Sequence, residues 1–239
     1  MVYTVCVTVV FMLGFIALIA MPWAALVAAR NRNDLEKAWY GLVVVGIAAA
    51  IVAFTVQIGF GTIWLAITTP APEDVYQFDL ILLSCVLPGL LLEACKVQGL
   101  YWFQDRLNRG NWVLHGFAVG AGSGIVQAIW LCGAVAINTL QGQGGITHEH
   151  LWLLFRCGAL IAMETAITGT AMLLIARGRS RSKVVFGAGA AHGALRLLAL
   201  IASMAPCAAV FGQAVVYALT SVAAGLWLRR EIERKGWPV

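Results

Sequence analysis

The sequence predicts an all-α integral membrane protein with seven transmembrane helices, and three observations support this prediction. Hydrophobic residues make up 61% of the 239 residues and charged residues only 11%, whereas about 25% of a soluble domain is charged. Seven apolar runs approach or exceed the roughly 20 residues that a helix needs to cross a bilayer. Basic residues also recur in alternate connecting segments.

The seven predicted spans follow one another with short connections and form one domain over residues 1–239. They are expected at about 4–29, 38–67, 77–103, 112–140, 151–176, 184–205 and 207–228. Gly59 and Gly61 leave the end of the second span open. Pro206 separates the sixth span from the seventh, because proline interrupts a helix.

The distribution of basic residues predicts the orientation. Lysine and arginine concentrate between spans 1 and 2, between spans 3 and 4, between spans 5 and 6, and in the tail after span 7. Cytoplasmic segments carry such an excess of positive charge. With seven spans, the N-terminus is therefore outside and the C-terminus is cytoplasmic. We expect a multi-pass protein of the plasma or cytoplasmic membrane, surrounded by the lipid bilayer.

The net charge of +5 does not indicate a nucleic-acid partner, because the basic residues lie at span ends and form no basic stripe with interleaved aromatic residues. The six cysteines contain no C-x-x-C pair and read as small apolar residues. A transporter is a weaker alternative, since paired broken helices and inverted repeats are not visible. Oligomeric state is left open.

Three ionisable residues near the middle of separate spans are the best indication of function: Glu93 in span 3, Glu164 in span 5 and His192 in span 6. A charge at the centre of a bilayer costs several kcal/mol, roughly 2.5–3.5 on insertion scales. Such residues therefore face the interior of a bundle. We expect spans 3 to 6, about 77–205, to surround a polar cavity to which all three contribute.

Four further polar residues of the same spans are expected to support this group: Lys96, Ser123, Gln127 and Arg196. Glu93 and Lys96 are three residues apart and share one helix face, which predicts an ion pair. Arg196 stays charged and needs a carboxylate, for which Glu164 is the predicted partner. Arg156 is expected near the outer interface, where it is solvated or extends toward water, as is Asp79.

Two chemistries suit two carboxylates and a histidine. They can activate a water molecule as general base and acid, with Glu93, Glu164 and His192 as the candidate catalytic residues. The same three residues could bind a divalent metal such as zinc, although no HExxH motif supports this. A purely structural ion network is the third interpretation.

Glycines at every fourth position predict close helix packing. Gly116, Gly120 and Gly124 form a doubled GxxxG pattern in span 4, and residues 187–194 of span 6 are almost all glycine or alanine. Small residues at this spacing let helix backbones approach closely in lipid.

The motifs around these residues resemble those of the YhfC and PrsW intramembrane protease families. Residues 89–96, GLLLEACK, resemble the helix with a Glu-Glu-x-x-Arg/Lys motif, and residues 120–128, GAGSGIVQA, resemble G-x-G-H-G-x-x-E-A. Residues 191–194, AHGA, resemble the last polar helix of the family. The superfamily also includes the anterior-pharynx-defective (Aph) subunit of gamma-secretase, a non-catalytic seven-span scaffold.

The resemblance implies two functions between which the residues do not decide. The first is a glutamate- or metal-dependent hydrolase that cleaves transmembrane protein substrates. The second is a pseudoprotease scaffold that docks partner subunits through its glycine-rich faces, because Leu92, Ser123 and Gln127 replace a glutamate, a histidine and a glutamate of the family motifs, and Glu164 stands near a histidine position.

Overall fold

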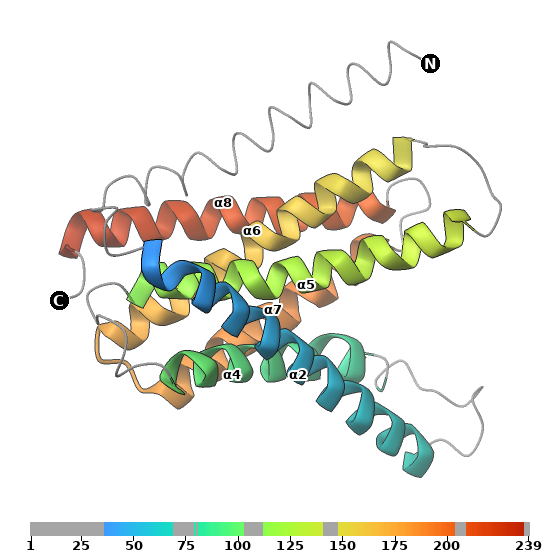
Figure 1. The fold of residues 1–239 in the computed structure, drawn as a ribbon, viewed down its shortest axis with the longest axis horizontal. Coiled ribbons are helices and arrows are strands. Elements are labelled where there is room, and N and C mark those ends of the chain that lie inside the picture. Colours follow the sequence, from blue (N-terminus) through green and yellow to red (C-terminus); the bar gives the residue numbers. More distant parts are fainter. Residues whose placement is uncertain are drawn as a thin grey trace.

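The computed structural model describes residues 36–68, 79, 81–102, 112–140, 148–203 and 209–236. These residues are helical apart from short turns, and they contain no strand. The helices are α2 (Glu36–Thr68), α4 (Leu87–Trp102), α5 (Trp112–Leu140), α6 (His148–Ala176), α7 (Arg181–Ser203) and α8 (Ala209–Lys235). A π-helical turn, η3 (Leu82–Val86), leads directly into α4 (Figure 1).

Six helical segments in this part of the chain are long and apolar enough to cross a membrane, and η3 and α4 together make one of them. They correspond to the second to seventh predicted spans. Their bounds agree with the prediction to within a few residues at most ends, although α8 extends to Lys235. The helix α2 continues through Gly59 and Gly61 to Thr68. The first predicted span, 4–29, lies outside the described residues.

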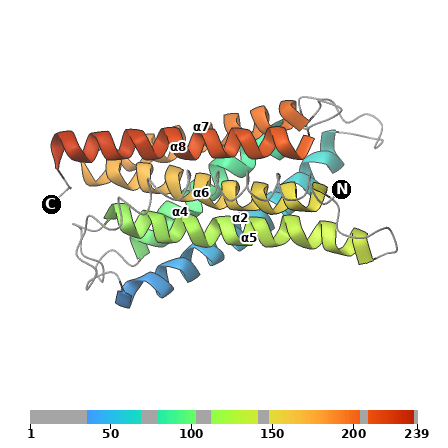
Figure 2. The same ribbon diagram turned by 90° about the horizontal axis from the view of Figure 1, so that it is seen from above.

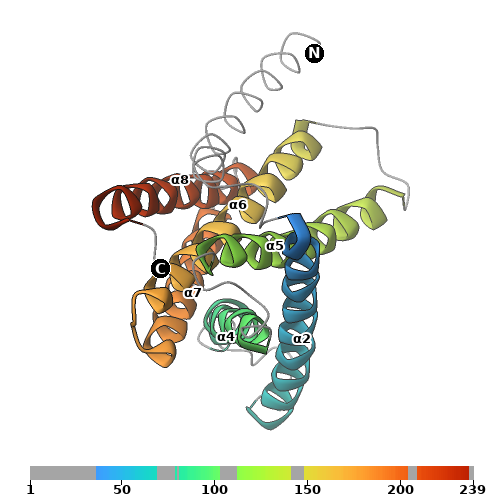
Figure 3. The ribbon, with the colours of Figure 1, turned by 60° about the vertical axis from the view of Figure 1, so that its left-hand side comes forward.

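The six helices form a closed ring in which each helix packs against two neighbours. The order around the ring is α2, α5, α6, α8, α7 and α4, and α4 in turn contacts α2. Figures 2 and 3 show α6 between α5 and α8, and Figure 3 shows α4 between α2 and α7. Smaller contacts across the ring join α4 with α5 and α6, and α6 with α7. The inward faces of α4, α5, α6 and α7 therefore meet in the middle of the bundle.

The predicted glycine packing is confirmed, and it lies between α5 and α6. A Cβ atom added at Gly120 would come within 2.6 Å of Glu164 O, and one at Gly124 within 2.7 Å of Ile161 Cα. At Gly116 it would come within 2.9 Å of Thr168 O. Only glycine permits this approach, because an alanine at these positions would require the two backbones to separate.

A second close crossing joins α4 and α7. A Cβ atom at Gly89 would come within 2.7 Å of both Gly189 O and Gly193 N. Pro88, which lacks an amide hydrogen, follows η3 at the start of α4. The π-helical turn directly precedes it, and the Leu87 amide donates to Leu82 O five residues back. Glu93 lies one helical turn after Gly89, next to this crossing.

Two of the basic segments of the sequence, the α6–α7 connection and the tail, meet at one end of the bundle, which we call the basic end. Arg177, at the end of α6, pairs with Glu231 of α8 at 2.7 Å. Arg181, at the start of α7, lies 4.0 Å from the ring centroid of Tyr101 at the end of α4. Gly178 (φ 80°) reverses the chain between α6 and α7. The described basic residues of these two segments therefore lie at one end of the bundle, and the cytoplasmic location of this end stays a prediction.

The prediction that Asp79 is solvated is wrong. Its side chain is 6% exposed, and one carboxylate oxygen accepts a hydrogen bond of 2.9 Å from Trp64 Nε1 of α2. The indole donor offsets part of the cost of removing the carboxylate from water. Arg156 is half-buried on α6.

Candidate functional site

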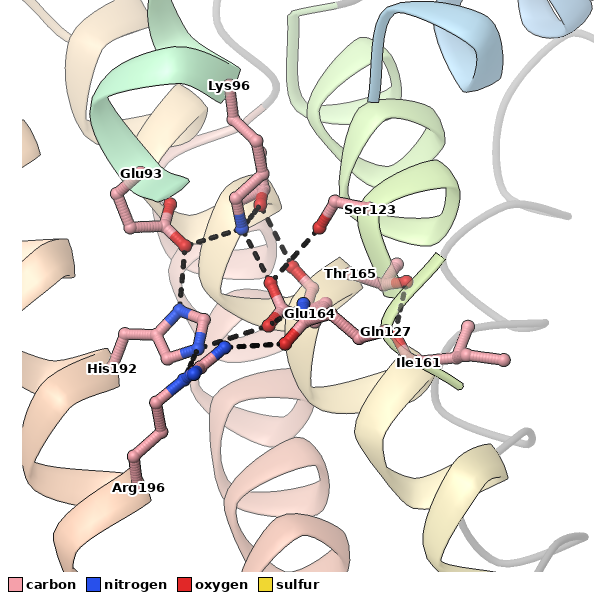
Figure 4. A network of polar contacts seen from close by, with 10 residues as sticks. Glu93, Lys96, Ser123, Gln127, Ile161, Glu164, Thr165, His192 and Arg196 are labelled. Atoms are coloured by element: carbon pink, nitrogen blue, oxygen red, sulfur yellow. Dashed lines mark hydrogen bonds and ion pairs between the residues drawn. The ribbon is translucent and has the colours of Figure 1, made fainter. Parts of the chain in front are cut away.

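The predicted convergence of Glu93, Glu164 and His192 is present in the structure. All three side chains are fully buried, and they come from α4, α6 and α7. One ligand atom from each lies within 4.8 Å of the other two. Lys96, Ser123, Gln127 and Arg196 join them in one network (Figure 4).

Lys96 is the cation at the centre of the network, and its side chain is fully buried. Its Nζ lies 2.5 Å from Glu93 Oε1 and 2.7 Å from Glu164 Oε2. The same nitrogen donates to Thr168 Oγ1 at 2.9 Å. An ammonium group has three hydrogens, and each of them has an acceptor here. Lys96 therefore joins α4 to α6, and the two carboxylates share its single positive charge.

Glu164 is the carboxylate with the most partners. Besides Lys96, its Oε2 accepts from Ser123 Oγ at 3.2 Å, and its Oε1 accepts from Gln127 Nε2 at 2.6 Å. Both of these donors lie on α5. The close approach of α5 at Gly120 and Gly124 brings their side chains within reach. The small-residue packing and the polar network are thus parts of one arrangement.

The predicted pair between Arg196 and Glu164 is wrong, because Glu164 pairs with Lys96 instead. Arg196 donates from Nη2 to Gln127 Oε1 at 2.6 Å and from Nε to His192 Nε2 at 3.1 Å. The amide of Gln127 therefore stands between Arg196 and Glu164. It accepts from the arginine through its oxygen and donates to the carboxylate through its nitrogen.

Both ring nitrogens of His192 have polar partners in the network. Arginine can only donate hydrogen bonds, so His192 Nε2 acts as the acceptor for Arg196. Nε2 also lies 3.1 Å from Glu164 Oε1, and Nδ1 lies 3.1 Å from Glu93 Oε1. The charges of the two carboxylates offset those of Lys96 and Arg196. This offset matters here, because an excess charge is costly in a buried, low-dielectric site.

One oxygen of the network has no partner. Glu93 Oε2 is buried and makes no hydrogen bond within the described residues. Its other oxygen contacts both Lys96 and His192. A buried carboxylate oxygen without a donor is unusual, and among the described residues it is the one buried side-chain atom of the network without a hydrogen-bond partner.

The residues do not fit a bound zinc ion, although their number and type match the prediction. The two ring nitrogens of His192 face different carboxylates, Glu93 at Nδ1 and Glu164 at Nε2, each at 3.1 Å. One ion can bind only one of these nitrogens. The ammonium of Lys96 also contacts both carboxylates. A divalent ion would add two positive charges to a balanced group of buried side chains.

Sequence reasoning missed Thr168. Its hydroxyl accepts from Lys96 and donates to Glu164 O at 2.9 Å. The spacing could have indicated it, since Thr168 follows Glu164 by four residues and therefore lies on the same face of the helix. Threonine is common in membrane helices as a donor to its own backbone, and this made it inconspicuous.

Comparisons with protein-family models, with curated proteins and with solved structures found no match for this chain. The interpretation of the site therefore depends on its residues and geometry.

We predict that Gln127→Glu destabilises the bundle by at least about 1–3 kcal/mol, because a carboxylate would replace the group that donates to Glu164. The free energy of unfolding in mixed micelles measures this. The matched control is Gln98→Glu near the basic end, where Gln98 Oε1 accepts from Arg181. The free energy of unfolding of this control should be unchanged or higher. Equal losses of stability in both variants would contradict the role of Gln127 as a donor to Glu164.

Proposed function

We propose that this protein is a non-catalytic membrane scaffold, of the kind that the Aph resemblance implies, whose buried polar network fixes the packing of its helices. The observation that carries the proposal is the position of Lys96. Its ammonium contacts both carboxylates and leaves none of its own hydrogens unpaired. In a hydrolase, one of those carboxylates would have to accept a proton from water.

The other residues of the network support the same conclusion. Gln127 stands where the family motif has a glutamate, and an amide has no useful basicity. Nε2 of His192 accepts from Arg196, and its Nδ1 faces Glu93. Both ring nitrogens are thereby engaged within the protein. Each group that could serve as an acid or base, with the exception of Glu93 Oε2, already has a partner.

A scaffold needs an outward surface on which its partners can pack. The glycines of α5, which we expected to form such a surface, face the interior of the bundle instead. Gly116, Gly120 and Gly124 are used within the chain, against α6, and Gly189 is used against α4. The outward face of α7 remains. Its exposed residues include four small ones, Gly187, Ala190, Ala191 and Ala194, which lie between the exposed large side chains of Phe186 and Leu198. A Cβ atom at Gly187 would meet nothing within 4 Å. We propose that a transmembrane helix of a partner subunit packs here, since small residues four apart permit close approach.

A hydrolase is the second candidate, and the unpaired Glu93 Oε2 favours it. A water molecule could donate a hydrogen bond to this oxygen. Glu93 would then act as the general base, with His192 as the acid. This candidate requires Lys96 to release Glu93 in the active state, because the ammonium now contacts the oxygen that also faces His192.

The scaffold proposal predicts a change in assembly without a change in fold. Extracted from its native membrane in mild detergent, the wild-type chain should migrate as a complex. Ala191→Leu should reduce it to a single chain, because the larger side chain keeps a partner helix away. Its thermal unfolding should match that of the wild type. Phe186→Leu, at an exposed position of the same helix, is the control and should retain the complex. A wild-type protein that migrates as a single chain would contradict the proposal.

The hydrolase candidate is tested with Glu93→Gln and His192→Ala in a cleavage assay on labelled single-span membrane proteins, after membrane insertion of both variants has been verified. The scaffold proposal predicts no cleavage above background in the wild type or in either variant. Cleavage by the wild type that both substitutions abolish would establish the hydrolase instead.

A further inference from the structure

The π-helical turn η3 leaves one carbonyl without a donor from its own helix. In an α-helix the Leu87 amide would donate to Leu83 O, four residues back, but here it donates to Leu82 O. In a continued π-helix the donor to Leu83 O would be the next residue. That residue is Pro88, which has no amide hydrogen. Leu83 O therefore receives no hydrogen bond from either position that could supply one.

Gln57 of α2 supplies the missing donor. Its Nε2 donates to Leu83 O at 3.2 Å. One turn later, a Cβ atom at Gly61 would lie 3.9 Å from Leu83 Cδ2, and after another turn Trp64 Nε1 donates to Asp79 Oδ1 at 2.9 Å. Residues at this spacing share one helix face. This face of α2 therefore holds the start of the span that leads into α4.

The same turn has a second hydrogen-bonding arrangement. If η3 became α-helical, the Leu87 amide would donate to Leu83 O, and Gln57 would no longer be needed there. Ser84 O would then lack a donor, because an α-helix would take it from the amide that Pro88 does not have. Each arrangement leaves one carbonyl that the backbone cannot satisfy. Gln57 provides for that carbonyl in the π-helical form and thereby favours it.

The turn packs against α7 beside the polar network. A Cβ atom added at Gly193 would come within 3.2 Å of Cys85 O and 3.3 Å of Val86 Cα. Gly193 directly follows His192, whose ring lies in the network. A change in η3 therefore alters the crossing of α4 and α7 next to the buried charges.

We propose that η3 is a conformational switch between a π-helical form, which Gln57 holds, and an α-helical form. Consecutive residues of an α-helix are roughly 100° apart, so the conversion turns the preceding segment by about this angle relative to α4. Cys85 is 2% exposed and lies between two exposed residues, Ser84 and Val86. The rotation brings Cys85 to an exposed position and releases its contact with α7. This inference does not depend on the proposed scaffold function.

The experiment measures how fast N-ethylmaleimide modifies each native cysteine of the full chain in proteoliposomes, with the sites resolved by mass spectrometry. Cys85 precedes Trp102, the end of α4, by about 17 residues or about 25 Å. It therefore lies near the opposite face of a hydrocarbon core of about 30 Å, within reach of an aqueous reagent. Cys157 of α6 is also buried and is the internal reference, because the switch does not move α6.

Gln57→Met should raise the rate of modification at Cys85 by about fivefold or more, because Leu83 O loses its donor in the π-helical form. The rate at Cys157 should not change. Thr55→Val is the matched control on α2, since Thr55 is exposed and its hydroxyl donates within its own helix. This control should leave both rates as they are in the wild type.

Pro88→Ala separates the switch from a general loosening of the bundle. The new amide gives Ser84 O a donor in the α-helical form, so the rate at Cys85 should again rise. Alanine favours helix over proline, so without a switch this substitution would leave Cys85 protected. The variant also keeps the test valid if Gln57→Met fails to fold. An unchanged rate at Cys85 in Pro88→Ala would overturn the proposal, as would equal increases at Cys85 and Cys157.

Discussion

The buried ammonium group of Lys96 is the constraint on which the rest of the bundle depends. Without it, two carboxylates would lie close together in a region that excludes water, at a cost of several kcal/mol for each charge. With it, Glu93 of α4 and Glu164 of α6 share one cation. The hydrogen bonds of Ser123, Gln127, His192 and Arg196 then extend this pairing to α5 and α7. Four helices are held in register by one group of side chains in which two carboxylates face two cations.

The close helix crossings make this network possible. Gly120 and Gly124 let α5 approach the backbone of α6 at the level of Glu164. Gly89, Gly189 and Gly193 do the same for α4 and α7, one turn from Glu93 and next to His192. Packing in lipid gains little from the hydrophobic effect between helices. Close van der Waals contact and interhelical polar bonds must therefore supply the specificity, and in this protein the two occur together.

Much of this arrangement could be predicted from the sequence. Six of the seven apolar runs correspond to helices, and the convergence of Glu93, Glu164 and His192 followed from the cost of charge in hydrocarbon. The partners of the charges could not be predicted, because helix spacing fixes faces within one helix but not the rotation of one helix against another. Arg196 was therefore assigned to Glu164, whereas Gln127 lies between them. Thr168 was missed because a threonine in a membrane helix gives no distinctive signal.

The most direct test of this account is a double-mutant cycle on Lys96 and Glu164. The free energy of unfolding would be measured in mixed micelles for Lys96→Met, for Glu164→Gln and for the two together. If the ion pair holds α4 to α6, each single substitution should cost about 3–5 kcal/mol, because it leaves a buried charge unpaired. The double substitution should cost less than the sum by at least about 2 kcal/mol. Additive losses would contradict the claim that these two side chains form the centre of the fold.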